Sequence, residues 1–271
     1  MTLAIPIDDP ADPRIDAYRS VRERDLVGRR GLFIAEGEVV VRVLLGGSLH
    51  PPVSLLLADK RLATLEAQIR ALPDTVPVFV ASQAVMDAVA GFHIHRGILA
   101  VGRRAAMPDA ATLLAEGGTR MMVMALFGIA NHDNVGGLFR NAAAFGADAV
   151  VLDSDCCDPL YRKAIRVSVG AALTVPFARL PHGEDALALL AERGFTAIAL
   201  SPRGTTLLAN VRRPDRVAAL FGAEGPGLPA DILGRVRTVR IPMAGELDSL
   251  NVATASGIVL HHLAFGPATQ G

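Results

Sequence analysis

The chain has 271 residues, about half of them apolar, with 27 basic and 27 acidic residues and no net charge. This length allows one large domain or two modest ones, each with a buried core. A neutral total argues against binding nucleic acid by bulk attraction alone. No apolar run reaches the roughly 18 to 20 residues of a membrane span, and the N-terminus lacks the pattern of a secretory signal.

The cysteine and arginine content bears on location and ligands. Cys156 and Cys157 are adjacent, a spacing that rarely closes a structural disulfide, so we expect small buried thiols in a reducing cytoplasm. Nearly all basic residues are arginine, which is explained either by a GC-rich genome or by phosphate binding. Arginines crowd the first 30 residues at Arg14, Arg19, Arg22, Arg24, Arg29 and Arg30. That stretch is equally consistent with an RNA contact and with a solvated helix face.

The first hundred residues alternate between strand and helix patterns. After an Arg-rich helical start, we expect strands at 32–34, 53–58, 76–81 and 96–102, and helices at 38–45, 63–72 and 83–91. Ser82 is suited to cap the last of these helices. The alternation predicts an α/β domain at 1–104 with a mostly parallel or mixed sheet. The Ala, Pro and Gly content of 105–119 predicts a linker with room for a short helix.

A second α/β series follows from residue 120 to residue 271. It begins with the unbroken apolar run MMVMALF at 121–127, which has the length of a buried strand. We expect further strands at 149–152, 196–200, 217–221 and 236–241. We expect helices at 136–145, 159–168, 183–193 and 250–264.

The first of three loops with functional promise follows the 121–127 strand and reads NHDNVGGLFRNAAAFGAD. Gly136 and Gly137 allow a ligand or another backbone to approach closely, and a helix starting there would offer free N–H groups to an anion. Asn134 precedes the glycines and Arg140 follows one turn later. Close packing alone is the alternative explanation.

The other two loops also follow predicted strands, at the sheet edge where α/β proteins bind ligands. LFGAEGPGLP (220–229) holds three glycines and two prolines, so it predicts a rigid bend around Glu224. IPMAGELDSLNVATASG (241–257) enters the last helix through Ser249, Leu250 and Asn251. Ser249 is suited to be the N-cap of that helix. Taken singly, each of these two loops is explained equally well as an ordered turn without a function.

Taken together and in order, NVGGLFRNAAAFGAD, FGAEGPGL and IPMAGELDSLNVA resemble the three motifs of the SpoU/TrmH family of the SPOUT superfamily. Members of that family are S-adenosylmethionine-dependent RNA ribose 2'-O-methyltransferases. The resemblance covers about 121–265 and includes YRKAIRVSVGAALTVPF at 161–177. More weakly, FIAEGEVVVRVLL through GILAVGRR is similar to the substrate-binding domain that often precedes the catalytic one.

The resemblance implies an architecture and a set of partners. It implies a C-terminal SPOUT methyltransferase domain at 120–271, with a parallel sheet and a deep trefoil knot, after a smaller N-terminal α/β domain that binds the RNA substrate. It also implies S-adenosylmethionine as cofactor, a structured rRNA or tRNA as substrate, and a cytoplasmic homodimer with the active site at the subunit interface. Neither a metal nor a membrane is implied.

Site residues follow from the resemblance motif by motif. The implied catalytic residues are Asn134, Arg140, Glu224, Ser249 and Asn251. The implied cofactor-binding residues are Gly222, Ala223, Gly225, Ile241, Met243, Leu250 and Asn251. Members often have a serine where this chain has Ala253, and we expect this departure to have a small effect. RNA phosphates are expected to contact the N-terminal arginines together with Arg162, Lys163 and Arg166.

Two other functions are open to the same sequence. The Gly136-Gly137 turn, followed by a strand ending at Asp153, imitates a dinucleotide-binding start, but G-x-G-x-x-G is absent. An RNA-binding or assembly protein could retain the fold without catalysis. The pairs His93 and His95, and His261 and His262, lack the companions at ligand spacing that a metal site needs.

Overall fold

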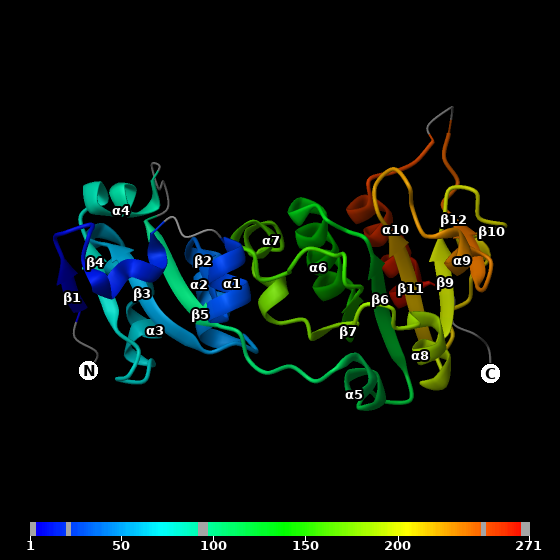
Figure 1. The fold of residues 1–271 in the computed structure, drawn as a ribbon, viewed down its shortest axis with the longest axis horizontal. Helices are drawn as coiled ribbons and strands as arrows, with labels where there is room; N and C mark the ends of the chain where they lie inside the picture. Colours follow the sequence, from blue (N-terminus) through cyan, green and yellow to red (C-terminus); the bar gives the residue numbers. More distant parts are fainter. Residues whose placement is uncertain (1–3, 20–22, 92–96, 245–247, 267–271) are drawn as a thin grey trace. The chain divides into compact units, whose positions relative to one another are not determined.

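The computed structural model describes residues 4–19, 23–91, 97–244 and 248–266 (Figure 1). Arg22, His93 and His95 therefore lie outside the described residues. The chain forms two compact units, each built around its own β-sheet. The first unit comprises Met1–Ala106 and Leu160–Thr174, and the second comprises Met107–Pro159 and Val175–Gly271.

This division differs from the expected domains in two stretches. Much of the expected linker belongs to the second unit, because it contains helix α5 (Ala110–Ala115), whose Leu113 and Leu114 are buried in that unit's core. Residues 160–174 lie in the sequence of the second unit but belong structurally to the first. There the carbonyl oxygen of Leu173 accepts a hydrogen bond from the N–H of Leu49 at 2.9 Å.

The first unit is built on a five-stranded mixed sheet with the order β1-β4-β3-β5-β2. The strands are β1 (Ala4–Ile7), β2 (Leu32–Glu36), β3 (Pro52–Ala58), β4 (Val78–Ala81) and β5 (Ile98–Arg103). Strands β1 and β3 run parallel to β4, whereas β5 is antiparallel to both β3 and β2. The prediction of a mixed sheet is confirmed, but β1 was expected to be part of a helical start.

Helices flank this sheet. They are α1 (Glu23–Arg30), α2 (Glu38–Gly46), α3 (Glu66–Arg70), α4 (Gln83–Ala90) and α7 (Arg162–Val167), with 3-10 turns η1 (Pro13–Tyr18), η2 (Asp59–Leu65) and η3 (Ala171–Leu173). The predicted cap of α4 is confirmed, since Ser82 Oγ accepts a hydrogen bond from the N–H of Val85. Only 66–70 of the expected 63–72 helix is α-helical, and its first three residues belong to the 3-10 turn η2.

The second unit is built on a seven-stranded sheet with the order β10-β12-β9-β11-β6-β7-β8, in which every pairing is parallel. The strands are β6 (Met121–Phe127), β7 (Ala149–Leu152), β8 (Phe177–Arg179), β9 (Thr196–Leu200), β10 (Thr206–Leu207), β11 (Arg216–Gly222) and β12 (Arg237–Arg240). All seven residues of β6 are buried. Strands covered on both faces need such unbroken apolar runs, which explains why this strand was predicted to the residue.

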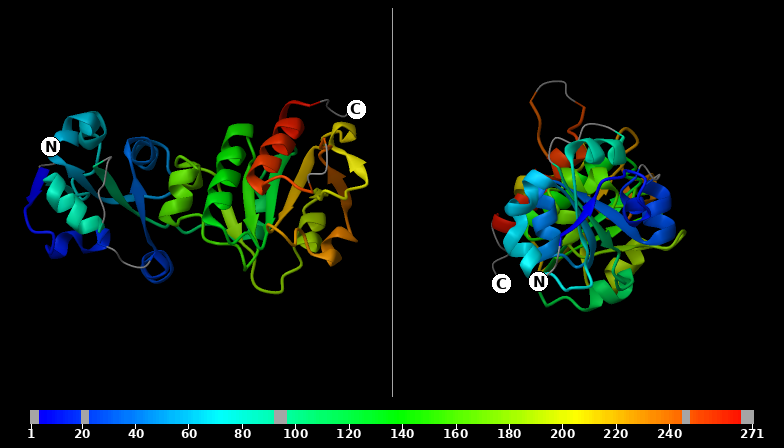
Figure 2. Two further views of the ribbon diagram at one scale, coloured as in Figure 1. Left: turned by 90° about the horizontal axis from the view of Figure 1, so that it is seen from above. Right: turned by 90° about the vertical axis from the view of Figure 1, so that its left-hand side faces the viewer.

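Helices cover both faces of the second sheet. On one face α5, α8 (Ala186–Glu192) and α9 (Ala230–Leu233) contribute to a core with alternate residues of β6. Helices α6 (His132–Phe145) and α10 (Val252–Phe265) lie side by side (Figures 1 and 2). The unit also contains the 3-10 turn η4 (Leu208–Asn210). Among the described residues, no helix is long and apolar enough to cross a membrane.

Two helix starts differ from expectation. Helix α6 begins at His132 rather than at Gly136, because the side chain of Asn131 caps it and both glycines lie inside it. Helix α10 is capped by Asn251, so the expectation that Ser249 is its N-cap is wrong. In both helices an asparagine Oδ1 accepts bonds from two backbone N–H groups of the first turn, as an N-cap does.

Candidate active site

The three loops that carry the motifs follow strands of the same parallel sheet, so they lie at its carboxyl edge. Phe127, which ends β6, is paired with Gly222, which ends the neighbouring strand β11. The first and second loops therefore leave the sheet next to each other. The third loop follows β12, which is separated from β11 by β9 alone.

The first loop is short and leads directly into α6. Asn131 Oδ1 accepts hydrogen bonds from the N–H groups of Asp133 at 2.8 Å and Asn134 at 3.4 Å. Asn134 consequently lies within the first turn of the helix, not in the loop before it, and only 5% of its surface is exposed. A buried amide needs partners, so the contacts of this side chain are informative about the site.

The second loop folds back on the end of β11. A Cβ atom on Gly222 would collide with the backbone of Gly227 and Leu228, so only glycine fits at this strand end. The loop is closed by a hydrogen bond of 2.9 Å from the N–H of Gly227 to the carbonyl oxygen of Ala223. Gly225 and Gly227 have φ angles of +84° and +73°, which glycine adopts readily. This fold leaves Glu224 exposed at the bend.

The third loop brings apolar side chains and Asn251 to the same sheet edge. Ile241, Met243 and Leu250 are partly exposed, and residues 245–247 lie outside the described residues. Asn251 Oδ1 accepts hydrogen bonds from the N–H groups of Ala253 at 2.9 Å and Thr254 at 3.3 Å. Since N–H groups must face an oxygen, these bonds fix which end of the amide points into the helix.

The Nδ2 group of Asn251, at the end of the amide that does not cap the helix, connects all three motifs. Its Nδ2 donates to Asn134 Oδ1 at 2.9 Å and to Glu224 Oε1 at 2.9 Å. These residues are 117 and 27 positions from Asn251 in the sequence. The structure therefore brings together three of the five predicted catalytic residues, one from each motif.

The other two predicted catalytic residues lie outside this cluster. Arg140 is exposed on α6, and Ser249 is exposed in the third loop two residues before Asn251. Within the described residues, neither side chain makes a hydrogen bond or ion pair. Because neither group is bound to another described residue, both are able to bind an external ligand, but this availability alone gives neither residue a role.

Asp153, considered above only as a dinucleotide mimic, organises the entrance to the first motif. Its Oδ2 accepts from the N–H of Gly128 at 2.8 Å, and its Oδ1 accepts from the N–H groups of Asp155 and Cys156 at 3.1 and 2.9 Å. Through these hydrogen bonds the carboxylate connects the loop after β6 to the loop after β7. The sequence did not predict this structural role of Asp153, because an acidic residue at the end of a buried strand is common in α/β proteins.

The cysteines belong to this loop support. Cys156 Sγ lies 3.3 Å from the N–H of Ile129 and 3.4 Å from the carbonyl oxygen of Leu126. Both thiols are free, as expected. Burial raises the pKa of the Cys156 thiol, and it raises that of Cys157 to about 12. Both groups are therefore protonated and poorly nucleophilic at neutral pH.

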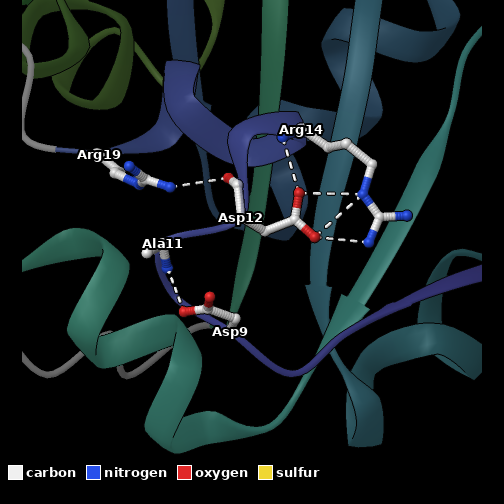
Figure 3. Close-up of polar contacts among 5 residues, drawn as sticks. All are labelled: Asp9, Ala11, Asp12, Arg14 and Arg19. Atoms are coloured by element: carbon white, nitrogen blue, oxygen red, sulfur yellow. Dashed lines mark hydrogen bonds and ion pairs between the residues drawn. The ribbon is translucent and has the colours of Figure 1, made fainter.

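Three of the arginines expected to contact RNA are bound to carboxylates or backbone carbonyl groups of the first unit. The guanidinium of Arg14 donates three hydrogen bonds of 2.6–3.1 Å from Nε and Nη2 to the carboxylate of Asp12 (Figure 3). Arg19 donates to the carbonyl oxygens of Pro10 and Asp12. In the same unit, Arg162 Nε donates to the buried Glu36 at 3.0 Å. These three guanidinium groups stabilise the first unit locally.

We call Asn134, Glu224 and Asn251 the asparagine cluster, and no metal site accompanies it among the described residues. Over the described ranges, no three His, Cys, Asp or Glu side chains come together as a metal ion would require. The cluster instead offers amide and carboxylate groups, open glycine backbone and partly exposed apolar side chains. Such a surface suits an organic ligand with both polar and apolar parts.

Comparison with known proteins agrees with this geometry. The model of the SpoU rRNA Methylase family matches residues 121–261. A tRNA/rRNA methyltransferase of Mycobacterium bovis, described as uncharacterized, is 43% identical over 279 residues, covering 96% of this chain and 93% of the relative. Another, from Mycolicibacterium paratuberculosis, is 34% identical over 206 residues, covering 75% of this chain and 66% of the relative.

Solved structures share the fold over nearly the whole chain. An AdoMet-bound rRNA methyltransferase from Sinorhizobium meliloti superposes with a TM-score of 0.80, at 23% identity, covering 95% of this chain and 96% of the other. An RNA 2'-O ribose methyltransferase gives 0.78 at 23% identity, covering 97% and 99%. The AdoMet complex of AviRb from Streptomyces viridochromogenes gives 0.77 at 20% identity, covering 93% and 98%.

The family match spans all three motifs and more than half of the chain, and the mycobacterial relatives align with it along most of its length. The convergence of Asn134, Glu224 and Asn251 gives that match a structural counterpart. The protein belongs to the SpoU family of RNA methyltransferases.

Proposed function

We propose that this protein transfers a methyl group from S-adenosylmethionine to a ribose 2'-hydroxyl in rRNA or tRNA. The observation that carries the proposal is the double hydrogen bond of Asn251 to Asn134 and Glu224, which draws the three motifs to one place. The printed descriptions of several similar proteins, an AdoMet-bound rRNA methyltransferase and an RNA 2'-O ribose methyltransferase among them, support it.

The residues present fit S-adenosylmethionine. Apart from the chain neighbours, no described residue lies within 4 Å of the position that a Cβ on Gly225 or Gly227 would take, so the backbone there is open to a ligand. Ile241, Met243 and Leu250 add partly exposed apolar surface. We assign cofactor binding to seven residues: Gly222, Ala223, Gly225, Ile241, Met243, Leu250 and Asn251. When bound, the cofactor supplies a methyl group attached to a sulfonium sulfur, and the sulfur leaves as a neutral thioether.

The chain's own residues have two tasks: to place the ribose oxygen in line with the methyl group, and to stabilise that oxygen as it loses its proton. Positioning alone is worth several kcal/mol. Asn134, Glu224 and Asn251 hold the three loops in register. Arg140 is positively charged and exposed, so it is suited to bind the adjacent RNA phosphate and to stabilise negative charge on the oxygen.

Arg140 is a poor choice for the base, because a guanidinium does not give up its proton in proteins. The proton of the 2'-hydroxyl is more readily accepted by a phosphate oxygen of the RNA or by water. Ser249 lies in the third loop two residues before Asn251, and we assign its exposed hydroxyl to a contact with the ribose or the cofactor. Both assignments complete the set of five proposed catalytic residues.

The remaining parts of the proposal concern partners. We assign RNA binding to the first unit and a homodimeric state with the active site at the subunit interface, in the cytoplasm. The chain has no net charge and few aromatic residues, 4% of the total, so RNA recognition should depend on shape and phosphate contacts more than on base stacking. A dinucleotide function is disfavoured because three N–H groups already occupy the Asp153 carboxylate.

Two measurements test the proposal together. Calorimetry should show binding of S-adenosylhomocysteine and no binding of NAD. Mapping of 2'-O-methyl groups in rRNA and tRNA from cells without the gene should show one or more sites missing, restored when the gene returns. A protein that ignores S-adenosylhomocysteine, or cells with every site intact, would contradict the proposal and favour an RNA-binding protein that kept the fold.

A further inference from the structure

A second asparagine joins α6 to α10, two turns along α6 from Asn134. The Nδ2 group of Asn141 donates to the carbonyl oxygen of Ala253 at 2.6 Å and to Ser256 Oγ at 2.9 Å. Ser256 is fully buried, and its hydroxyl in turn donates to the same Ala253 oxygen at 2.8 Å. Both hydrogens of the Asn141 amide are therefore used to bind the first turns of α10.

The two helices are also in close contact at this point. A Cβ on Gly137 would lie 2.6 Å from the Cβ of Ala253, and one on Gly257 would lie 3.3 Å from Asn141 Nδ2. Any side chain at position 137 would therefore clash with α10, and one at position 257 would crowd the Asn141 amide. Asn141 fits into the space left by Gly257, so its amide has little freedom to move away from the Ala253 carbonyl.

Ala253 connects this contact to the asparagine cluster. Its carbonyl oxygen accepts from Asn141, while its N–H donates to Asn251 Oδ1 at 2.9 Å. The bonds to Oδ1 orient the Asn251 amide, and the other end of that amide holds Asn134 and Glu224. A continuous series of hydrogen bonds thus runs from Asn141 to the residues that join the three motifs.

We propose that Asn141 is a positioning residue for the methyl-transfer reaction. By fixing the first turn of α10 against α6, it sets the place and orientation of Asn251 opposite Asn134 and Glu224. Asn141 forms no hydrogen bond with those three residues within the described part of the chain, so it acts through Ala253. The inference rests on the proposed function, because a positioning role requires a reaction to be positioned.

The test is Asn141→Ala, assayed for kcat, for KM, and for the NMR signals of the Asn251 side-chain amide without cofactor. A small displacement of reacting groups can cost up to about 100-fold in rate, so kcat should fall roughly 10- to 100-fold. KM for S-adenosylmethionine should change little, and the Asn251 amide signals should shift. Ser256→Ala leaves the Ala253 contact in place and should give a smaller change of the same kind.

The matched control is Phe145→Leu. Phe145 contacts the ring of His261, 5.7 Å between centroids, at the other end of the same helix pair. This variant loosens α6 against α10 away from the cluster, so kcat and the Asn251 signals should match those of the wild type. If Asn141→Ala keeps full kcat and unshifted Asn251 signals, the inference is wrong. A wild-type protein that transfers no methyl group, yet shows the Asn251 shift in the variant, would instead overturn the proposed function.

Discussion

Asn251 has two contributions that single substitutions can separate. Its Oδ1 caps α10, while its Nδ2 binds Asn134 and Glu224. Serine is also a good N-cap and carries no charge that would repel Glu224, so Asn251→Ser should retain stability, whereas Asn251→Ala should lose about 1 kcal/mol of unfolding free energy. Both variants remove the Nδ2 donor, so both should lower kcat, and by about 100-fold for the serine. Urea unfolding and methyl-transfer assays measure the two effects.

The comparison of these two variants separates catalysis from stability. A kcat that follows stability, falling in Asn251→Ala and staying normal in Asn251→Ser, would mean that Asn251 acts only as a helix cap. The sequence could have identified this cap, because asparagine is among the preferred N-cap residues. We assigned the cap to Ser249, and no local pattern distinguished two candidate caps only two residues apart.

Arg140 should matter for the reaction and little for the fold. Its side chain is exposed and forms no hydrogen bond or ion pair within the described residues, so Arg140→Ala should leave the unfolding free energy within about 0.5 kcal/mol. Loss of a charge that stabilises the reacting oxygen should lower kcat by about 100-fold or more. Arg235→Ala, which breaks a surface pair with Asp185, is the control and should keep full activity. Normal turnover in Arg140→Ala would remove it from the mechanism.

The pair of Asp12 and Arg14 predicts a pH effect in the first unit. The hydrogen bonds from Arg14 lower the pKa of the Asp12 carboxyl from its ordinary value to about 2. Because the folded state has the lower pKa, the contribution of this pair is complete above about pH 4 and is lost as the pH falls through 2. An NMR titration of the Asp12 side chain should show this low midpoint, and Arg14→Ala should return it toward the ordinary value.

At the level of elements, the contact between α6 and α10 depends on Gly137. Alanine there would place its Cβ 2.6 Å from that of Ala253, so Gly137→Ala should cost about 1–3 kcal/mol of unfolding free energy through overpacking. Gly28 in α1 is the matched control, because no other group of the described residues lies within 4 Å of its Cβ position. Gly28→Ala should stabilise by up to about 1 kcal/mol. Equal effects in the two variants would contradict the close contact.

Elements that depend on an unbroken apolar run were predictable, whereas those set by distant partners were not. Strands β6, β7 and β9 were predicted to the residue. The edge strand β10, two residues long, has too short a pattern to be recognised. The Gly136-Gly137 pair suggested a turn, but in the structure Gly137 is a helical residue that admits α10. A glycine is needed at position 137 because of Ala253, which is more than 100 residues away in the sequence. No local pattern could have predicted this contact.

For the whole molecule, the order of the motifs predicted the family, the fold class and the shared sheet edge. The sequence did not predict that residues 160–174 belong to the first unit, because their helical pattern carries no information about which sheet they pack against. The same applies to the hydrogen bonds that connect Asn134, Glu224 and Asn251. The trefoil knot and the homodimer stay predictions from the resemblance.

The most direct test of the central claim is the identity of the methylated atom. RNA from cells without the gene should be incubated with methyl-labelled S-adenosylmethionine and the protein, then digested to nucleosides. We predict label in a 2'-O-methylated nucleoside with the wild-type protein, and almost none with Asn251→Ser. Label on a base, or equal label in ribose from both proteins, would contradict the claim that the three motifs converge to form a ribose methylation site.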